Sequence, residues 1–167
     1  ATNASLSSWS AVSSTVYTAT ITPSTSAPSI VVASSKFTDG AGNNNSTSNT
    51  YNWTHDATVP TMTITCSAVA DGGSHNAAVT MTFTSSEATG NFVVGDVTAT
   101  NAALSSWNAV SSTVYTATVT PSTSAPSIVV ASSKFTDGAG NNNSTSNTYN
   151  WTHDTTVPTM TLSCSAV

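Results

Sequence analysis

Apolar and polar residues alternate over several short stretches of the chain, and this pattern predicts β-strands. Between residues 59 and 69, Met62, Ile64 and Cys66 alternate with threonines. A period of two is typical of a strand with one buried face. By the same pattern, or by a short apolar run, further strands are expected at 77–84, 93–101, 103–110, 114–120, 127–131 and 147–153. No stretch has the helical period, so we expect an all-β chain of antiparallel β-sandwich domains.

Turn-forming residues separate these expected strands. The sequence ADGGSHN at residues 70–76 contains Gly72 and Gly73, which supply backbone freedom for a turn. SSEATGN, TPSTSAP and TDGAGN interrupt the alternation further along the chain. The spacing of strands and turns is that of a small sandwich domain.

The chain contains a long internal repeat. Ala1–Val69 aligns without a gap with Ala99–Val167, at an offset of 98 residues. The six differences are Ser5/Ala103, Ser10/Asn108, Ile21/Val119, Ala57/Thr155, Ile64/Leu162 and Thr65/Ser163. A fixed long period indicates a tandem array.

The repeat sets the expected domain boundaries. Residues 57–154 are expected to form one complete domain, 1–56 a partial domain without its first strands, and 155–167 the first strand of a further one. The missing strands are expected from a chain that continues at both ends or from a neighbouring chain, since an open sheet edge needs a partner.

Composition narrows the class of function. Serine and threonine number 63 residues, whereas lysine and arginine number 2 and the net charge is −5. Nucleic-acid binding needs basic residues to neutralise phosphates, so this composition argues against it. No run of 18 apolar residues predicts a membrane span. A surface solvated by hydroxyls and amides is typical of secreted or cell-surface material.

Catalysis has few residues to work with. The chain has one glutamate and no arginine, and no grouping of histidine with serine or cysteine stands out. His55 and His153 each lie beside one aspartate, which falls short of the four ligands of a zinc site. We therefore expect no enzyme activity.

Several motifs together resemble a known family. They are SSEATGNFVVGDVTATNAALSSW, STVYTATVTP, FTDGAGNNNS and THDTTVPT, in that order. The run is similar to bacterial immunoglobulin-like repeat domains of large surface adhesins and extracellular filaments. The resemblance covers nearly the whole repeat, although the cysteine and the Asn-Asn-Asn-Ser-Thr tract depart from it. It implies tandem immunoglobulin-like sandwiches that act as stalks, spacers or binding tips, without catalysis.

Acidic residues near the ends of the expected domains are candidates for calcium. They are Glu87, Asp39, Asp56, Asp137 and Asp154. Calcium takes six to eight oxygen ligands, and the adhesin resemblance implies that an ion at a domain junction would stiffen the string. The alternative is that Asp137 and its neighbouring glycines make a tight turn and that Asp154 begins a proline-containing linker.

Sequons mark candidate glycosylation sites. Asn-x-Ser/Thr occurs at Asn3, Asn44, Asn45, Asn52, Asn142, Asn143 and Asn150. Tyr149 and Trp151 should point to the core face of their strand, so Asn150 should point outward, where a glycan needs it. Bare polar surface is the alternative, because a chain rich in Asn and Thr contains sequons by chance.

Cysteines and aromatics complete the candidates. Cys66 and Cys164 lie one repeat apart, too far to pair within a straight string of domains. Each is either a small buried residue or the site of a disulfide between chains. The aromatics at 107, 115, 149 and 151, with their copies at 9, 17, 51 and 53, are expected to pack in cores rather than to bind sugars.

The sequence thus predicts a structural repeat of an extracellular filament or adhesin stalk. Its expected partner is itself, end to end or by strand addition with the segment 157–167, and a cell-surface or carbohydrate ligand is expected only at a tip outside this stretch. The alternative function is a carbohydrate-binding or other ligand-binding β-sandwich module of a secreted protein.

Overall fold

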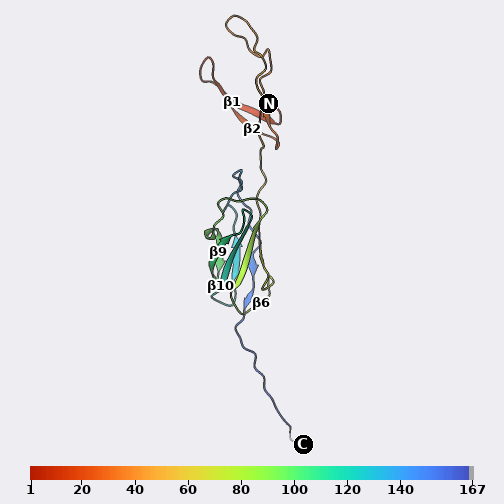
Figure 1. Cartoon of the computed structure of the whole chain (residues 1–167), viewed down its shortest axis with the longest axis vertical. Helices are drawn as coiled ribbons and strands as arrows, with labels where there is room; N and C mark the ends of the chain where they lie inside the picture. The colour runs from red at the N-terminus through yellow and green to blue at the C-terminus, as the bar shows by residue number, and fades with distance from the viewer. Residues whose placement is uncertain (166–167) are drawn as a thin grey trace. The chain divides into compact units, whose positions relative to one another are not determined.

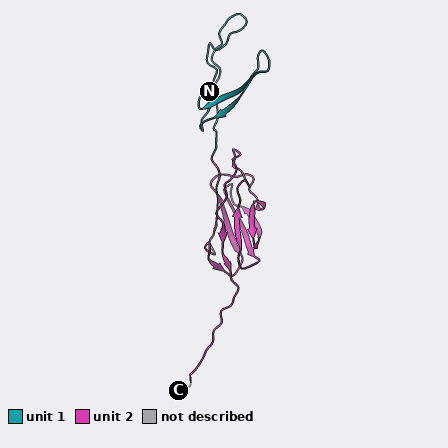
Figure 2. Cartoon of the chain, turned by 180° about the vertical axis from the view of Figure 1, so that it is seen from behind, with its two compact units in different colours: residues 1–57 teal, residues 58–167 magenta. Residues whose placement is uncertain are grey.

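The alternating stretches form strands in the computed structural model, which describes residues 1–165 (Figure 1). Among these residues the helical structure is a single 3-10 turn, η1, at Val94–Asp96. The chain divides into two compact units, Ala1–Ala57 and Thr58 to the end of the chain (Figure 2). The prediction of an all-β sandwich is confirmed.

Unit 2 has a four-stranded antiparallel sheet in the order β5-β7-β10-β9. These strands are β5 (Met62–Cys66), β7 (Val79–Ser85), β9 (Ala102–Ala109) and β10 (Val114–Pro121). In β5 and β7 the threonines lie mainly on the solvent side and the apolar residues on the buried side. β-branched threonine suits an exposed strand face.

The second sheet of unit 2 has the order β12-β11-β8. It contains β8 (Val97–Thr100), β11 (Ser127–Val130) and β12 (Tyr149–Asn150). The chain passes from β8 in this sheet to β9 in the other sheet at Asn101, whose φ of 58° makes a sharp bend. Asparagine tolerates this left-handed conformation better than most residues.

The structure corrects four details of the sequence prediction. The strand expected at 59–69 ends at Cys66, and the strand expected at 93–101 begins as η1. The strand expected at 147–153 is split into β12 and β13 (Thr152–His153). The turn expected at 70–76 contains a short strand, β6 (Ser74–His75), which pairs with β13 in parallel.

The cause of the parallel pair lies at Gly72. Its φ of 77° turns the chain after β5, and its N–H donates to the carbonyl of Asn150 at 2.7 Å. This bond brings the segment that follows β5 alongside the last strands of the domain. Glycine reaches this conformation without steric cost, so the turn depends on it.

The two sheets of unit 2 enclose one hydrophobic core. Phe83 and Phe135 are nearly fully buried, and Phe92 lies against both of their rings at centroid distances of 6.1 and 5.1 Å. Trp107 stacks on Tyr115 at 5.7 Å and covers the edge of this cluster. The core also contains Met62, Ile64, Val69, Val79, Met81, Val97, Ala117, Val119, Ile128, Val130, Tyr149 and Trp151.

Unit 1 repeats the second half of unit 2. It contains β1 (Ala4–Ala11) paired with β2 (Tyr17–Pro23), and β3 (Ser29–Ile30) paired with β4 (Tyr51–Asn52). Counterparts of β5, β6 and β7 are absent from residues 1–57. Apolar side chains of unit 1, among them Leu6, Trp9 and Tyr17, are therefore exposed.

The expected core role of the aromatics is confirmed in unit 2 and wrong in unit 1. Tyr115 is 4% exposed, whereas its copy Tyr17 is 52% exposed. Trp9, the copy of the half-buried Trp107, is 68% exposed. The reason is tertiary. Tyr115 packs against Phe92 at a centroid distance of 5.0 Å and donates to the Thr89 carbonyl, and residues 1–57 contain no copies of Phe92, Thr89 or β7.

The last segment, 155–165, has the same alternation as β5 but forms no strand. Met160 and Leu162, the copies of the buried Met62 and Ile64, are 87% and 90% exposed. A strand needs a neighbour to bond with, and none lies beside this segment. Ala166 and Val167, the last residues of the strand expected here, lie outside the described residues.

Candidate functional site

The loop between β11 and β12 contains Asp137, one of the calcium candidates. Its Oδ1 accepts hydrogen bonds from the backbone N–H groups of Ala139 and Asn141 at 2.9 Å, and its Oδ2 accepts from Asn141 Nδ2 at 2.8 Å. The side-chain bond from Asn141 is the main cause that lowers the pKa of Asp137. These bonds are those of a tight Asx-type turn.

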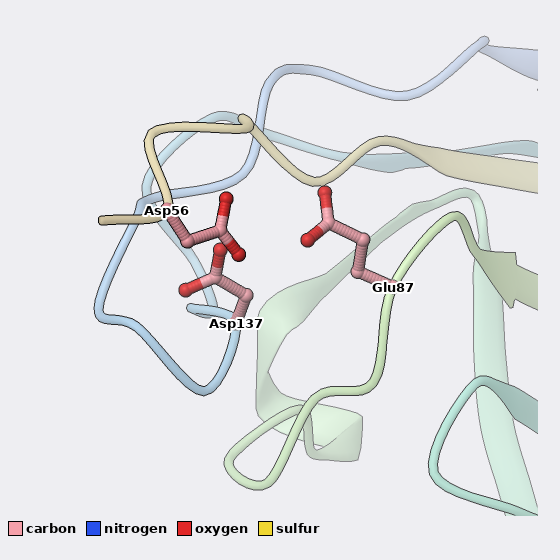
Figure 3. A group of neighbouring side chains, drawn as sticks. All are labelled: Asp56, Glu87 and Asp137. Carbon is pink, nitrogen blue, oxygen red and sulfur yellow. The ribbon is translucent and has the colours of Figure 1, made fainter. Parts of the chain in front are cut away.

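Figure 3 draws three of the five calcium candidates, Asp56, Glu87 and Asp137. In unit 2, Glu87 and Asp137 each offer one carboxylate oxygen, and these two atoms lie within 4.8 Å of one another (Figure 3). Carboxylates at this spacing suit a calcium ion, but exposed acidic groups are common without one. Asp56 belongs to unit 1, and the two carboxylates of unit 2 supply fewer than the six to eight oxygen ligands that calcium takes.

The other two calcium candidates, Asp39 and Asp154, accept hydrogen bonds from backbone N–H groups a few residues further along the chain. Asp39 makes in unit 1 the same turn as Asp137, with its Oδ1 accepting from Ala41 and Asn43 at 2.9 Å. Asp154 accepts from the backbone N–H of Thr156 at 2.9 Å, and this bond lowers the pKa of its carboxyl. Each arrangement matches the turn or linker alternative.

The sequon asparagines fall into different environments. Asn150 is exposed between the buried Tyr149 and Trp151, so its side chain lies on the outer face of β12. Its copy Asn52 is also exposed, as are Asn3, Asn44 and Asn142. Asn3 Nδ2 donates to the Ala27 carbonyl at 3.0 Å. The exposed side chains at 44, 52, 142 and 150 lie on the solvent side, where a glycan requires them.

Asn143 does not suit a glycan in the folded domain. It is 2% exposed, and its Oδ1 accepts from the backbone N–H groups of Lys134 and Phe135 at 2.7 and 2.9 Å. Its Nδ2 donates to the carbonyls of Ala131 and Ser144 at 2.8 and 2.7 Å. Both hydrogens of the amide are therefore used inside the protein.

The copy of this residue, Asn45, has the same pattern of bonds in unit 1. Its Oδ1 accepts from Lys36 and Phe37, and its Nδ2 donates to Ala33 and Ser46. It is half-buried. Of the candidate sequons, 45 and 143 are thus structural asparagines that hold a loop in shape.

Both edges of the four-stranded sheet are protected. At β5, Asn147 Oδ1 accepts from the backbone N–H of Ile64 at 2.8 Å, and Asn147 Nδ2 donates to the Ile64 carbonyl at 3.0 Å. At β9, a bulge with Ser106 at a φ of 51° breaks the regular register. Bulges and occupied backbone groups keep other strands from adding to an edge.

Asn147 was missed by the sequence reading. It lies in an asparagine-rich stretch, and its pairing with Ile64 joins residues 83 positions apart. Nothing local in the sequence distinguishes it from its neighbours. Only the fold brings the amide to the strand edge.

A shallow polar depression lies where the chain leaves unit 2. It has a volume of about 270 Å³ and is lined by Ser74, His75, Asn76 and Asp154. The hydrogen bond that joins these residues is a backbone one, from the Asp154 N–H to the His75 carbonyl at 3.1 Å. This bond continues the backbone pairing of β6 with β13, so the depression is the end of a strand pair.

Cys66 and Cys164 are both free thiols. Cys66 is half-buried at the end of β5 and packs against the core, whereas its copy Cys164 is exposed. Among residues 1–165, no helix is long and apolar enough to cross a lipid bilayer.

The fold and the comparison with known families agree on the class of protein. Two sheets around one core, with the chain passing from one sheet to the other between β8 and β9, define an immunoglobulin-like sandwich. Residues 56–152, more than half of the chain, match the bacterial Ig-like domain family. The chain belongs to this family. No curated protein and no solved structure matches it.

Proposed function

We propose that the chain is a structural repeat of an extracellular filament or adhesin stalk, whose role is extension and display. The observation that carries this proposal is the direction of the chain through unit 2. Its first and last segments run parallel, with β6 beside β13. A chain that enters a domain at one end and leaves it at the other strings identical domains end to end.

The near-identity of the repeats supports the same role. Between Ala1–Val69 and Ala99–Val167 six positions differ, and each residue change keeps the polar or apolar class except Ala103 for Ser5 and Thr155 for Ala57. In an array of this kind each domain contacts mainly its neighbours, so copy number sets length. Function then resides in reach and stiffness rather than in a pocket.

The protected edges favour separate beads over strand exchange between complete domains. Asn147 occupies both backbone groups of Ile64 in β5, and the bulge of β9 disrupts the opposite edge. Self-association of this chain is therefore proposed to run end to end. The aromatics of unit 2 are used in its core, and this gives the carbohydrate-binding alternative no specific support.

The test measures length against copy number. Chains with two, four and eight copies of residues 57–154 would be compared by small-angle X-ray scattering and by electron microscopy. Each added copy is expected to increase the maximum dimension by a constant increment. A maximum dimension that grows with the cube root of mass, as for domains that collapse onto each other, would contradict the proposal.

Electron microscopy of the native material tests the same proposal in its setting. Beaded filaments that continue through several repeats are expected. Isolated particles that bind a sugar saturably would move the assignment to a binding module.

A further inference from the structure

Hydrogen bonds join the first and last segments of unit 2 along their whole length. Residues 60–75 and 144–154, which we call the terminal clamp, run in the same direction. In order, the bonds are Ser144 N to Pro60 O (3.0 Å), Asn147 to both backbone groups of Ile64 (2.8 and 3.0 Å), Tyr149 Oη to Val69 O (2.6 Å), Gly72 N to Asn150 O (2.7 Å), Asn150 N to Asp71 Oδ1 (2.8 Å), Thr152 N to Gly73 O (2.8 Å) and Asp154 N to His75 O (3.1 Å).

Much of this clamp does not depend on a regular sheet. Pairing of β6 with β13 covers two residues on each strand. Outside that pair, two backbone bonds, Ser144 N to Pro60 O and Gly72 N to Asn150 O, also join the segments. The other contacts use side chains: the Asn147 amide, the Tyr149 hydroxyl and the Asp71 carboxylate. Together these backbone and side-chain bonds extend the connection beyond the two residue pairs of the β6–β13 ladder.

The parallel direction decides how the clamp responds to tension. In a string of repeats, force enters unit 2 near Thr58 and leaves after Asp154. Because the two segments are parallel, pulling these points apart slides one segment along the other. All the bonds then resist together, whereas an antiparallel terminal pair would open one bond at a time.

We propose that unit 2 bears tension and that the terminal clamp is the element that resists it. The inference rests on the proposed function, in which repeats are pulled from both ends, and it names the part of each repeat that carries the load. Resistance to force is governed by the unfolding rate. Bonds that must break before the rest of the domain opens therefore matter more than their equilibrium contribution.

The experiment pulls the full chain from its two ends in a single-molecule instrument at constant force. Unit 2 is expected to unfold in one step with a contour gain of about 300 Å, since an extended chain spans roughly 3.3–3.6 Å per residue. Asn147→Ala removes both bonds to Ile64. Its unfolding rate at fixed force is expected to rise about tenfold or more.

Two controls isolate the clamp. Asn49→Ala makes the same change at the copy of Asn147 in unit 1, and the unfolding rate of unit 2 should stay unchanged. Asn101→Ala, outside the clamp, removes the bond from Asn101 Nδ2 to Ala125 O and places alanine at a φ of 58°. It should lower the stability in urea while leaving the unfolding rate under force within about twofold of the wild type.

The proposal is overturned if the unfolding rates of Asn147→Ala and Asn101→Ala rise in proportion to their losses of stability in urea. It is also overturned if unit 2 opens in several small steps that begin at Asp154. Near-ultraviolet circular dichroism would verify that each variant is folded, and Tyr149→Phe, which removes one clamp bond, provides a milder second variant. The two proposals can fail separately. If the maximum dimension grows linearly with copy number but Asn147→Ala and Asn101→Ala respond equally to force, the clamp alone is contradicted. If Asn147→Ala selectively speeds unfolding under force but the native material forms no filaments, the proposed function alone is contradicted.

Discussion

Replacing Asn143 by alanine tests whether a buried asparagine holds the β11–β12 loop. The side chain is 2% exposed and makes four hydrogen bonds, to two backbone N–H groups and two carbonyls. Each bond contributes about 1 kcal/mol net, so the four together contribute about 4 kcal/mol. A domain of this size has a total stability of about 5–15 kcal/mol, so this single change should remove a large share of it.

Urea unfolding followed by the aromatic signal measures the effect. With a slope of about 1.5 kcal/mol per molar urea, a loss of about 4 kcal/mol lowers the midpoint by about 2.7 M. The slope itself should not change, since the same surface is exposed on unfolding. Near-ultraviolet circular dichroism of the aromatic core reports unit 2 specifically, because the core rings of Tyr115, Tyr149 and Trp151 are buried there.

Asn45→Ala is the matched control. It deletes the same four bonds in the same local sequence, but in unit 1. The cooperative transition of unit 2 should therefore keep its midpoint. A loss below about 1 kcal/mol in Asn143→Ala, or an equal shift in both variants, would refute the reasoning that burial makes this amide a stabilising group.

Three further predictions concern titration and reactivity. Hydrogen bonds from Asn141 lower the pKa of Asp137 below 3.8, so its stabilising contribution is present above that pH and lost below it; the stability difference between wild type and Asp137→Asn should shrink as the pH falls below 3.8 in urea titrations. Burial raises the pKa of Tyr149 above 10.0, so stability should decline as the pH rises above 10.0, and a Tyr149→Phe chain that declines equally would contradict this assignment. Cys164 is exposed and Cys66 half-buried, so a maleimide should label Cys164 first and oxidation should cross-link chains through it; equal labelling rates, read by mass spectrometry, would show that β5 does not protect its thiol.

The strands of the sandwich could be predicted from the sequence because their signal is local. Met62 and Ile64 alternate with threonines, and a strand with one buried face requires only that period. The repeat was equally visible, since 63 of the 69 aligned positions are identical. The family resemblance followed from motifs that recur in fixed order over the same stretch, and residues 56–152 match that family.

The tertiary structure decided which of two identical residues is buried or makes a long-range contact. Tyr17 and Tyr115 occur in the same local sequence, yet one is 52% exposed and the other 4%. Asn49 and Asn147 are likewise copies, and only Asn147 meets a strand edge in the structure described for residues 1–165. Burial depends on strands that lie far away in the sequence.

The same reason explains the sites. A sequon marks Asn143 and Asn150 alike, but the fold turns the first inward to hold a loop and the second outward to solvent. The short strand β6 was hidden in a glycine turn because its partner, β13, lies 78 residues further on. Periodicity and composition determine the elements and their class, whereas long-range contacts determine which side chains are buried, which edges are closed and how the two ends of the domain are joined.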